Sequence, residues 1–419
     1  MARPVKIRPA IVFLHRWVGL FLAAFLIIEG VTGSLLAFRS EITRFLDPTT
    51  IVAPPHPGAG PLAAGELAQR VDLHLSPFAR VAYFFPTPDA GQQVLRVAPR
   101  IDPNTGRPFE ISYGIVVVDP WTGRELKRAP FEGYSSNLAA NVMPFIYQLH
   151  INLALNGLGY WLLGIVALLW TLDCIWSVYL TFPMSLGGFF SNWRRAWAIK
   201  WPSPSAFRFN FDLHRASGLW TWALLLAFAW SSVELTRMPV YDAVTGAVLE
   251  YRTFEQDIAG MPQHDPALPP RLNWIEAQAR GDAILADLAR HEGFRIERPT
   301  TLAYFAENGI YSYEVRTSRR FPQFENLDIY FNGDTGQLFR VMRPSGEHAG
   351  NTLTNWLRGL HLITDPVDYV VYRWVVFALG WIVALLAGTG VYIWLRKRRG
   401  RLNRRTRHPP AEEARPSWV

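Results

Sequence analysis

Cysteine is almost absent from this sequence, since Cys174 is the single one in 419 residues. One thiol cannot form an intrachain disulfide, and it rules out a zinc or iron–sulfur site built from four cysteines of this chain alone. No Cys-x-x-Cys-His motif is present, so covalently attached haem is not expected. The GxGxxG, P-loop and GxSxG motifs are missing too, which removes the usual signals of nucleotide binding and serine hydrolysis.

Acidic residues are fewer than basic ones, 34 against 42, and the net charge is +8. Such a balance is compatible with nucleic-acid binding, but the placement of the basic residues argues against it. They gather at the ends of long apolar runs, as the cytoplasmic flanks of membrane helices do. The densest group follows the last run and consists of Arg396, Lys397, Arg398, Arg399, Arg401, Arg404, Arg405 and Arg407.

Half of the residues are hydrophobic, and they concentrate in four runs long enough to cross a bilayer, which takes about 20 residues. We therefore predict an α-helical membrane protein with four transmembrane helices. The first run is too long for a signal peptide and is expected to be retained. The predicted order is cytoplasmic N-terminus and first span 1–38, exposed domain 39–157, second span 158–183, cytoplasmic loop 184–212, third span 213–235, exposed domain 236–369, fourth span 370–395 and basic cytoplasmic tail 396–419.

The two long exposed segments carry strand and turn signals. The stretches 114–128, 239–252 and 329–342 each place a D-x-x-T-G or D-T-G turn between β-prone flanks, where glycine supplies positive φ and aspartate caps the turn. A helical pattern runs from Asn273 to His291. Each exposed segment is expected to form a small α+β domain.

The chain also looks duplicated. The motif His-Arg-x-x-Gly-Leu opens the first run at His15 and the third run at His214, and a Leu-His pair precedes the second run at His150 and the fourth at His361. The repeating unit is helix, exposed domain, histidine, helix, as a pseudo-twofold axis along the membrane normal requires.

These motifs, their order and their duplication resemble the PepSY-associated transmembrane helix family, whose members include iron-regulated membrane proteins and ferric-siderophore reductases of the FoxB and PiuB kind. The resemblance covers nearly the whole chain. It implies two b haems, PepSY-like domains in the periplasm, a bacterial inner-membrane location and reduction of iron delivered as a siderophore complex. The cytoplasmic pieces are too short for the flavin reductase domain of some larger relatives, so the cytoplasmic electron donor stays unidentified.

The four histidines suit haem iron, because two axial imidazoles from facing helices make an electron-transfer centre. We expect His15 and His214 to hold one haem on the cytoplasmic side, and His150 and His361 to hold another on the outer side. The outer histidines precede their runs and are expected on separate turns before the spanning helices. The alternative is that these are interfacial histidines inherited by duplication.

Four further side chains are candidates at these sites. Arg16 and Arg215 match the carboxylates of haem propionates, although ordinary cytoplasmic-side charge explains them equally well. Glu29 and Asp173 are acids inside apolar runs, where carboxylates are costly. Both are candidates for proton relay, and Glu29 also for a hydrogen bond to a ligand imidazole.

The leading interpretation is a di-haem oxidoreductase that carries electrons from a cytoplasmic donor to a periplasmic ferric siderophore or other ferric chelate. One alternative is a non-enzymatic membrane anchor whose PepSY-like domains bind or inhibit an extracytoplasmic protein. Another is a transporter, although four spans with large exposed domains make a poor solute carrier.

Overall fold

The computed structural model divides into two compact units. A helical unit comprises Met1–Arg39, Phe145–Tyr241 and Val370–Val419, and a sheet unit comprises Ser40–Pro144 and Asp242–Tyr369. Apart from the side chains at 85 and 404–407, the structure describes residues 7–46, 53–54, 56, 58, 60–85, 91–130, 138–185, 187–253, 255–256, 259–318, 326–343, 345–362 and 370–407.

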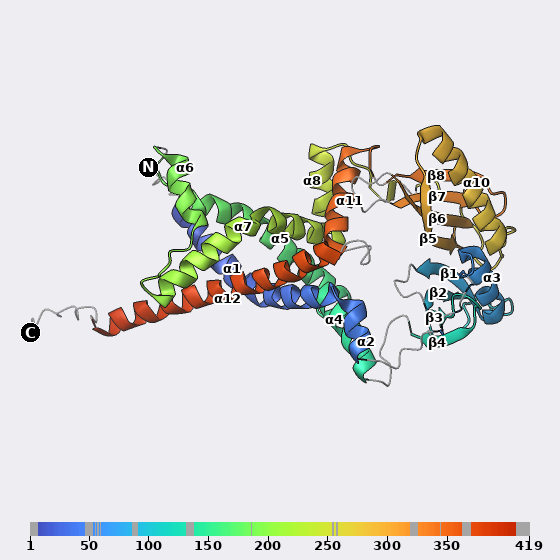
Figure 1. Cartoon of the computed structure of the whole chain (residues 1–419), viewed down its shortest axis with the longest axis horizontal. Coiled ribbons are helices and arrows are strands. Elements are labelled where there is room, and N and C mark those ends of the chain that lie inside the picture. Colours follow the sequence, from blue (N-terminus) through green and yellow to red (C-terminus); the bar gives the residue numbers. More distant parts are fainter. Residues whose placement is uncertain are drawn as a thin grey trace, which may run out of the picture. The chain divides into compact units, whose positions relative to one another are not determined.

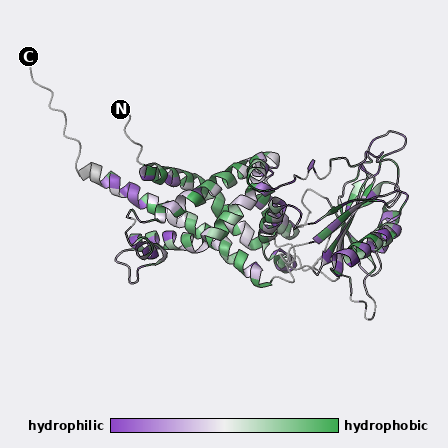
Figure 2. Ribbon diagram, turned by 90° about the horizontal axis from the view of Figure 1, so that it is seen from above, coloured by the Kyte–Doolittle hydropathy of each residue, from purple (hydrophilic) through white to green (hydrophobic). Residues whose placement is uncertain are grey.

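Four long helices form the first unit (Figure 1). They are α1 (Ile7–Leu36), α5 (Gly157–Thr181), α7 (Ala206–Leu235) and α12 (Val370–Arg407). Each is long and apolar enough to cross a membrane, and Figure 2 shows their mainly hydrophobic colouring. Helix α1 contacts α5 and α12, and α7 contacts the same two, so the four helices close into a ring. The prediction of four spanning-type helices is confirmed.

Small residues bring α1 and α12 together. Gly30 and Gly380 face each other so closely that a Cβ on either would overlap the backbone of the other. Beside them the Ser34 hydroxyl donates to the carbonyl of Phe377 at 2.8 Å. Close approach of backbones strengthens dispersion contacts between helices that gain little from the hydrophobic effect in lipid. This crossing fixes how α12 lies along α1.

Helix α7 begins seven residues before the third apolar run of the sequence. Ser205 is its N-cap, and the hydroxyl accepts from the backbone N–H of Arg208 at 3.2 Å. A polar first turn therefore precedes the apolar part. As a result, His214 lies inside the helix rather than at its border, and His15 likewise lies inside α1.

The second unit contains one antiparallel sheet of eight strands in the order β4-β3-β2-β1-β5-β6-β7-β8. The strands are β1 (Ala79–Phe85), β2 (Gln93–Pro99), β3 (Ile115–Val118), β4 (Glu125–Ala129), β5 (Ile296–Phe305), β6 (Ile310–Thr317), β7 (Asn326–Asn332) and β8 (Leu338–Met342). Helices α3 (Ala64–Leu75) and α10 (Trp274–Glu292) pack on the sheet and share one hydrophobic core with it. The predicted helix 273–291 is confirmed by α10.

The two exposed segments, expected as two domains, each contribute four strands and one helix to this single sheet and core. The junction is the pairing of β1 with β5, where Tyr83 lies opposite Ala303. Joining the halves there removes two exposed strand edges. On the helix side, the backbone N–H of Gly65 donates to the Gln278 side chain at 2.6 Å, which ties α3 to α10.

Two of the three predicted hairpins are confirmed, and one is wrong. The stretch 114–128 forms β3 and β4, and 329–342 forms β7 and β8. The stretch 239–252 instead begins with helix α8 (Pro239–Val248). Its Tyr241 is 1% exposed, and its ring contacts that of Trp230 in a tilted arrangement with a ring-centre distance of 5.0 Å. Packing against α7 therefore outweighs the β-propensity of this segment.

Shorter helices precede the second and fourth long helices. Helix α4 (Leu138–Asn152) carries His150 in its last turn, and α11 (Ala349–Leu362) carries His361 in its last turn. Both histidines thus lie on separate elements before the long helices, as expected, but these elements are helices of 15 and 14 residues and not the short turns that the sequence predicted. Other short helices are α2 (Arg39–Leu46), α6 (Phe189–Trp193) and the 3-10 turn η1 (Arg194–Trp197).

Candidate functional site

A cavity of about 820 Å³ lies among the four long helices of the helical unit. Its walls come from residues 8–26 of α1, 170–181 of α5, 211–225 of α7 and 383–401 of α12. Cofactor pockets commonly measure roughly 300–1,000 Å³ and have mainly apolar walls with a few polar groups. The size of this cavity falls within that range.

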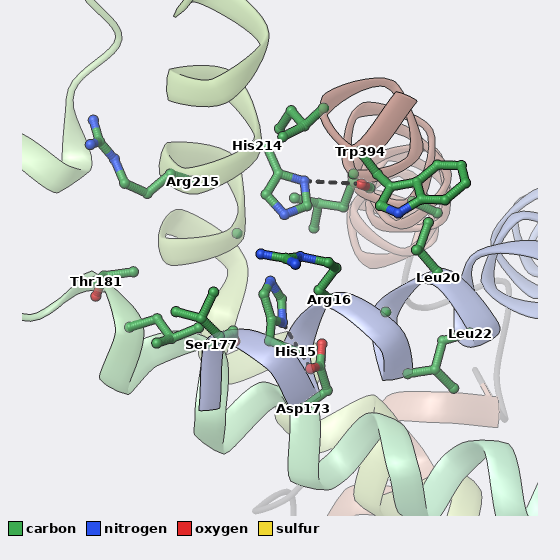
Figure 3. A pocket seen from close by; sticks show the side chains of 18 of the residues that line it. His15, Arg16, Leu20, Leu22, Asp173, Ser177, Thr181, His214, Arg215 and Trp394 are labelled. Atoms are coloured by element: carbon green, nitrogen blue, oxygen red, sulfur yellow. Dashed lines mark hydrogen bonds and ion pairs between the residues drawn. The ribbon is translucent and has the colours of Figure 1, made fainter. Parts of the chain in front are cut away.

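Two imidazoles face each other across the cavity. His15 extends from α1 and His214 from α7, with their ring centres 6.3 Å apart and their planes inclined by 49°. Figure 3 shows the rings turned toward one another. The motif duplicated in the sequence therefore brings its two histidines together in space, on two different helices.

Each imidazole is held through its Nδ1 atom. His15 Nδ1 lies 2.8 Å from Oδ1 of Asp173 on α5. His214 Nδ1 lies 3.0 Å from the backbone carbonyl of Leu386 and 3.0 Å from the hydroxyl of Thr389, both on α12. A carbonyl or carboxylate oxygen can only accept, so Nδ1 carries the hydrogen in each ring. The lone pair of a neutral imidazole is then on Nε2, which is free to bind a metal.

The spacing of the two rings fits axial ligands of one iron. An imidazole nitrogen lies about 2.0–2.1 Å from a first-row metal that it binds. Because the ring centre lies roughly 1 Å behind that nitrogen, two rings on opposite sides of one metal have centres roughly 6 Å apart. The observed 6.3 Å agrees with this value.

The donor set also suits a haem better than a bare ion. Among the residues that the structure describes, no group of three or more His, Cys, Asp or Glu side chains is arranged to hold a metal ion. A porphyrin supplies four nitrogen ligands of its own and needs axial ligands from the protein. Two opposed imidazoles in a largely apolar cavity therefore fit haem by chemistry and by spacing.

Basic side chains line part of the same cavity: Arg8, Arg16, Arg215, Lys397 and Arg401. Within the described part of the chain, Arg16 has no hydrogen-bond or ion-pair partner, and Figure 3 shows it beside the imidazoles. Arg8 differs, because it donates to the backbone carbonyls of Leu180 and Phe182. Arg16 is thus available to a ligand carboxylate. Lys397 and Arg401, which the sequence analysis assigned to the basic tail and not to a site, also line the cavity.

Arg215 has a different environment from Arg16, although the sequence motif makes them equivalent. Its guanidinium donates to the Asp212 carboxylate at 2.9 Å and to the carbonyls of Arg195, Ala196 and Ala198. Figure 3 shows it turned away from the two histidines. These bonds tie the loop before α7 to that helix. Asp212 is fully buried and was not singled out by the sequence analysis.

His150 lies in a second polar cluster of the helical unit. Its Nδ1 is 2.9 Å from the Thr32 hydroxyl and 3.1 Å from Oε2 of Glu29, both on α1. Gly33 leaves room for the ring, since a Cβ there would come within 3.1 Å of it. The other carboxylate oxygen of Glu29 is buried with no hydrogen-bond partner among the described residues. The contact of Glu29 with His150 thus corresponds to the hydrogen bond that the sequence analysis expected between Glu29 and a candidate ligand imidazole.

His361 belongs to the sheet unit, whereas His150 belongs to the helical unit. Its helix α11 is anchored within the sheet unit, where the backbone N–H of Gly350 donates to the carbonyl of Glu250 at 2.8 Å. The pairing of His150 with His361 stays a prediction.

The fold defines a multi-pass membrane protein with a separate antiparallel sheet domain. Its sequence matches the family model described as the PepSY-associated TM region over residues 12–397. The chain therefore belongs to that family, as its motifs indicated. No curated protein sequence matches the chain.

Proposed function

We propose that this protein is a di-haem b oxidoreductase of the bacterial inner membrane, which passes electrons from a cytoplasmic donor to a periplasmic ferric siderophore. The observation that carries the proposal is the opposed pair His15 and His214, with ring centres 6.3 Å apart in a cavity of about 820 Å³. His15 and His214 would hold a haem here, and the haem would supply one-electron redox chemistry.

The residues of the cavity have separable roles in this proposal. His15 and His214 provide the two Nε2 ligand atoms from different helices, so the site depends on the assembled bundle. Arg16 provides a cation for a propionate carboxylate. Apolar wall residues such as Leu22, Leu225 and Val383 limit the access of water, which lowers the local dielectric and strengthens these interactions.

The order of elements supports the proposed duplication and the second haem. A long helix, a short helix with four strands, a histidine-bearing helix and another long helix occur twice: α1, α3, β1–β4, α4, α5 and then α7, α10, β5–β8, α11, α12. His150 and His361 occupy equivalent positions in the two halves. The polar contacts of His150 with Thr32 and Glu29 support a role for that ring beyond apolar packing.

The direction of transfer and the acceptor rest on charge placement and family membership. Basic residues occupy the last turns of α12 and the segment before α7, which supports cytoplasmic termini and a cytoplasmic 184–212 loop. The sheet unit would then face the periplasm. There a ferric chelate would accept one electron and become ferrous, and the lower charge of Fe(II) weakens its binding to anionic oxygen ligands. The donor is an unidentified cytoplasmic reductant.

The direct test is the absorption spectrum of the full-length protein, purified after expression with ample haem supply. We expect a Soret band that shifts on dithionite reduction, and two haems per chain. His15→Ala and His214→Ala should each remove one haem, whereas His291→Ala, at an exposed histidine of α10, should remove none. A colourless wild-type protein would refute the proposal and favour the non-enzymatic anchor. Stopped-flow reoxidation by several ferric chelates then tests the acceptor.

A further inference from the structure

The two opposed imidazoles have chemically unequal partners. His214 donates to a neutral carbonyl and lies near a neutral hydroxyl, those of Leu386 and Thr389. His15 donates to the carboxylate of Asp173, at 2.8 Å. The Asp173 side chain is 13% exposed and comes from α5, a helix that supplies neither imidazole. A carboxylate placed in this apolar setting calls for a role.

A carboxylate acceptor changes the ring that donates to it in two ways. It fixes the hydrogen on Nδ1 and orients the ring, so that Nε2 points to the metal position. It also raises the basicity of the ligand, because negative charge near Nδ1–H increases the electron density at Nε2. A more basic ligand stabilises ferric iron more than ferrous iron, since the ferric ion carries the higher charge. A neutral carbonyl, such as that of Leu386 beside His214, raises the basicity of its imidazole less.

We propose that Asp173 is a positioning residue of the His15–His214 site, which orients His15 toward His214 and lowers the reduction potential of the haem held there. The inference rests on the proposed function, because it concerns the same pair of imidazoles. It makes the inner centre a stronger reductant, which favours onward transfer of the electron. Asp173 does not touch the iron in this arrangement and acts through His15 alone.

The test is a potentiometric titration of the full-length haem protein carrying Asp173→Asn. The amide keeps the size of the side chain and its acceptor oxygen but removes the charge. We expect one of the two haem components to shift by about tenfold in its ferric/ferrous equilibrium, toward ferrous, which is about 59 mV for a one-electron couple. The other component should not move.

Two further variants separate charge from structure. Asp173→Glu keeps the carboxylate and should restore most of the low potential. Thr171→Val changes a polar residue two positions away on the same helix, whose hydroxyl donates to the carbonyl of Ala167, and should leave both potentials unchanged. Loss of one haem in Asp173→Asn with retention in Asp173→Glu would also support the positioning role.

The outcomes distinguish this inference from the proposed function. Wild-type protein without haem would end both. Two haems with the same two potentials in wild type and in Asp173→Asn would overturn the role of Asp173 and leave the di-haem proposal standing. A shift of equal size in Thr171→Val would likewise overturn it, because the effect would then follow any disturbance of α5.

Discussion

A partly buried carboxyl group in the sheet unit provides a sharp prediction about stability. Asp328 on β7 lies directly opposite Glu314 on β6, and its Oδ1 accepts from the Ser312 hydroxyl at 2.9 Å. Burial, with a smaller contribution from the charge of Glu314, raises the pKa of Asp328 from 3.8 to about 7. The folded sheet therefore disfavours the ionised form.

The sign of the pH effect follows from this pKa. Below pH 3.8 the carboxyl is protonated in both the folded and the unfolded chain, so it contributes no pH dependence. Between 3.8 and about 7 the unfolded chain loses the proton first, and stability falls as pH rises. Each unit of pKa corresponds to about 1.4 kcal/mol, so the loss reaches at most about 4 kcal/mol.

We expect Asp328→Asn to remove this loss, because asparagine keeps the acceptor oxygen for Ser312 and cannot ionise. The variant should unfold at a higher temperature than wild type at pH 7.5, and the gap should shrink toward pH 4. Each kcal/mol corresponds to about 2–4 °C in the Tm of a unit of this size. Thermal unfolding of the full-length protein in detergent at several pH values measures this difference in Tm between the variant and wild type.

Asp287→Asn is the matched control, because Asp287 is 58% exposed on α10. It should leave the pH dependence unchanged. Parallel Tm curves for wild type and Asp328→Asn from pH 4 to 8 would refute the reasoning.

Two more predictions concern the helical unit. With apomyoglobin as the haem acceptor, Arg16→Gln should speed the loss of haem from the protein about tenfold. Arg215→Gln should have a smaller effect, because Arg215 is bound to Asp212 and to loop carbonyls. Equal rates in both variants would contradict the proposed contact of Arg16 with a propionate. Gly380→Leu should destabilise the bundle by about 1–3 kcal/mol or more through overlap with α1, seen as a lower Tm in detergent. Gly388→Leu is the control, since a Cβ there meets nothing within 4 Å. An unchanged Tm in Gly380→Leu would contradict the close crossing of α1 and α12.

The spans and two hairpins were predictable because their signals are local. An apolar run of about 20 residues has few alternatives to a membrane helix. Asp119 and Gly123 sit in a turn whose geometry selects those residue types, with Gly123 at φ 73°. The stretch 239–252 carries the same D-x-x-T-G pattern, yet it begins with helix α8, in which Tyr241 contacts Trp230 of α7. The turn pattern alone does not reveal that contact.

The candidate site divides in the same way. The His-Arg-x-x-Gly-Leu motif marks His15 and His214 as a pair, because it occurs twice in the chain. The motif could not tell Arg16 from Arg215, since their difference comes from Asp212 and from the loop that folds onto α7. The sequence could not predict the contact of Thr389 with His214, because 175 positions separate the two residues in the chain.

Sequence alone predicted the membrane class, the four long apolar helices and the family, and it singled out the candidate histidines, because hydrophobic length and recurring motifs are properties of the chain itself. Tertiary packing decides that the two exposed segments share one sheet, that Asp173 bonds His15, and that two imidazoles face each other at 6.3 Å. Each of these features joins residues from distant segments. Close packing of helices and pairing of strand edges bring them together, and no local pattern encodes that geometry.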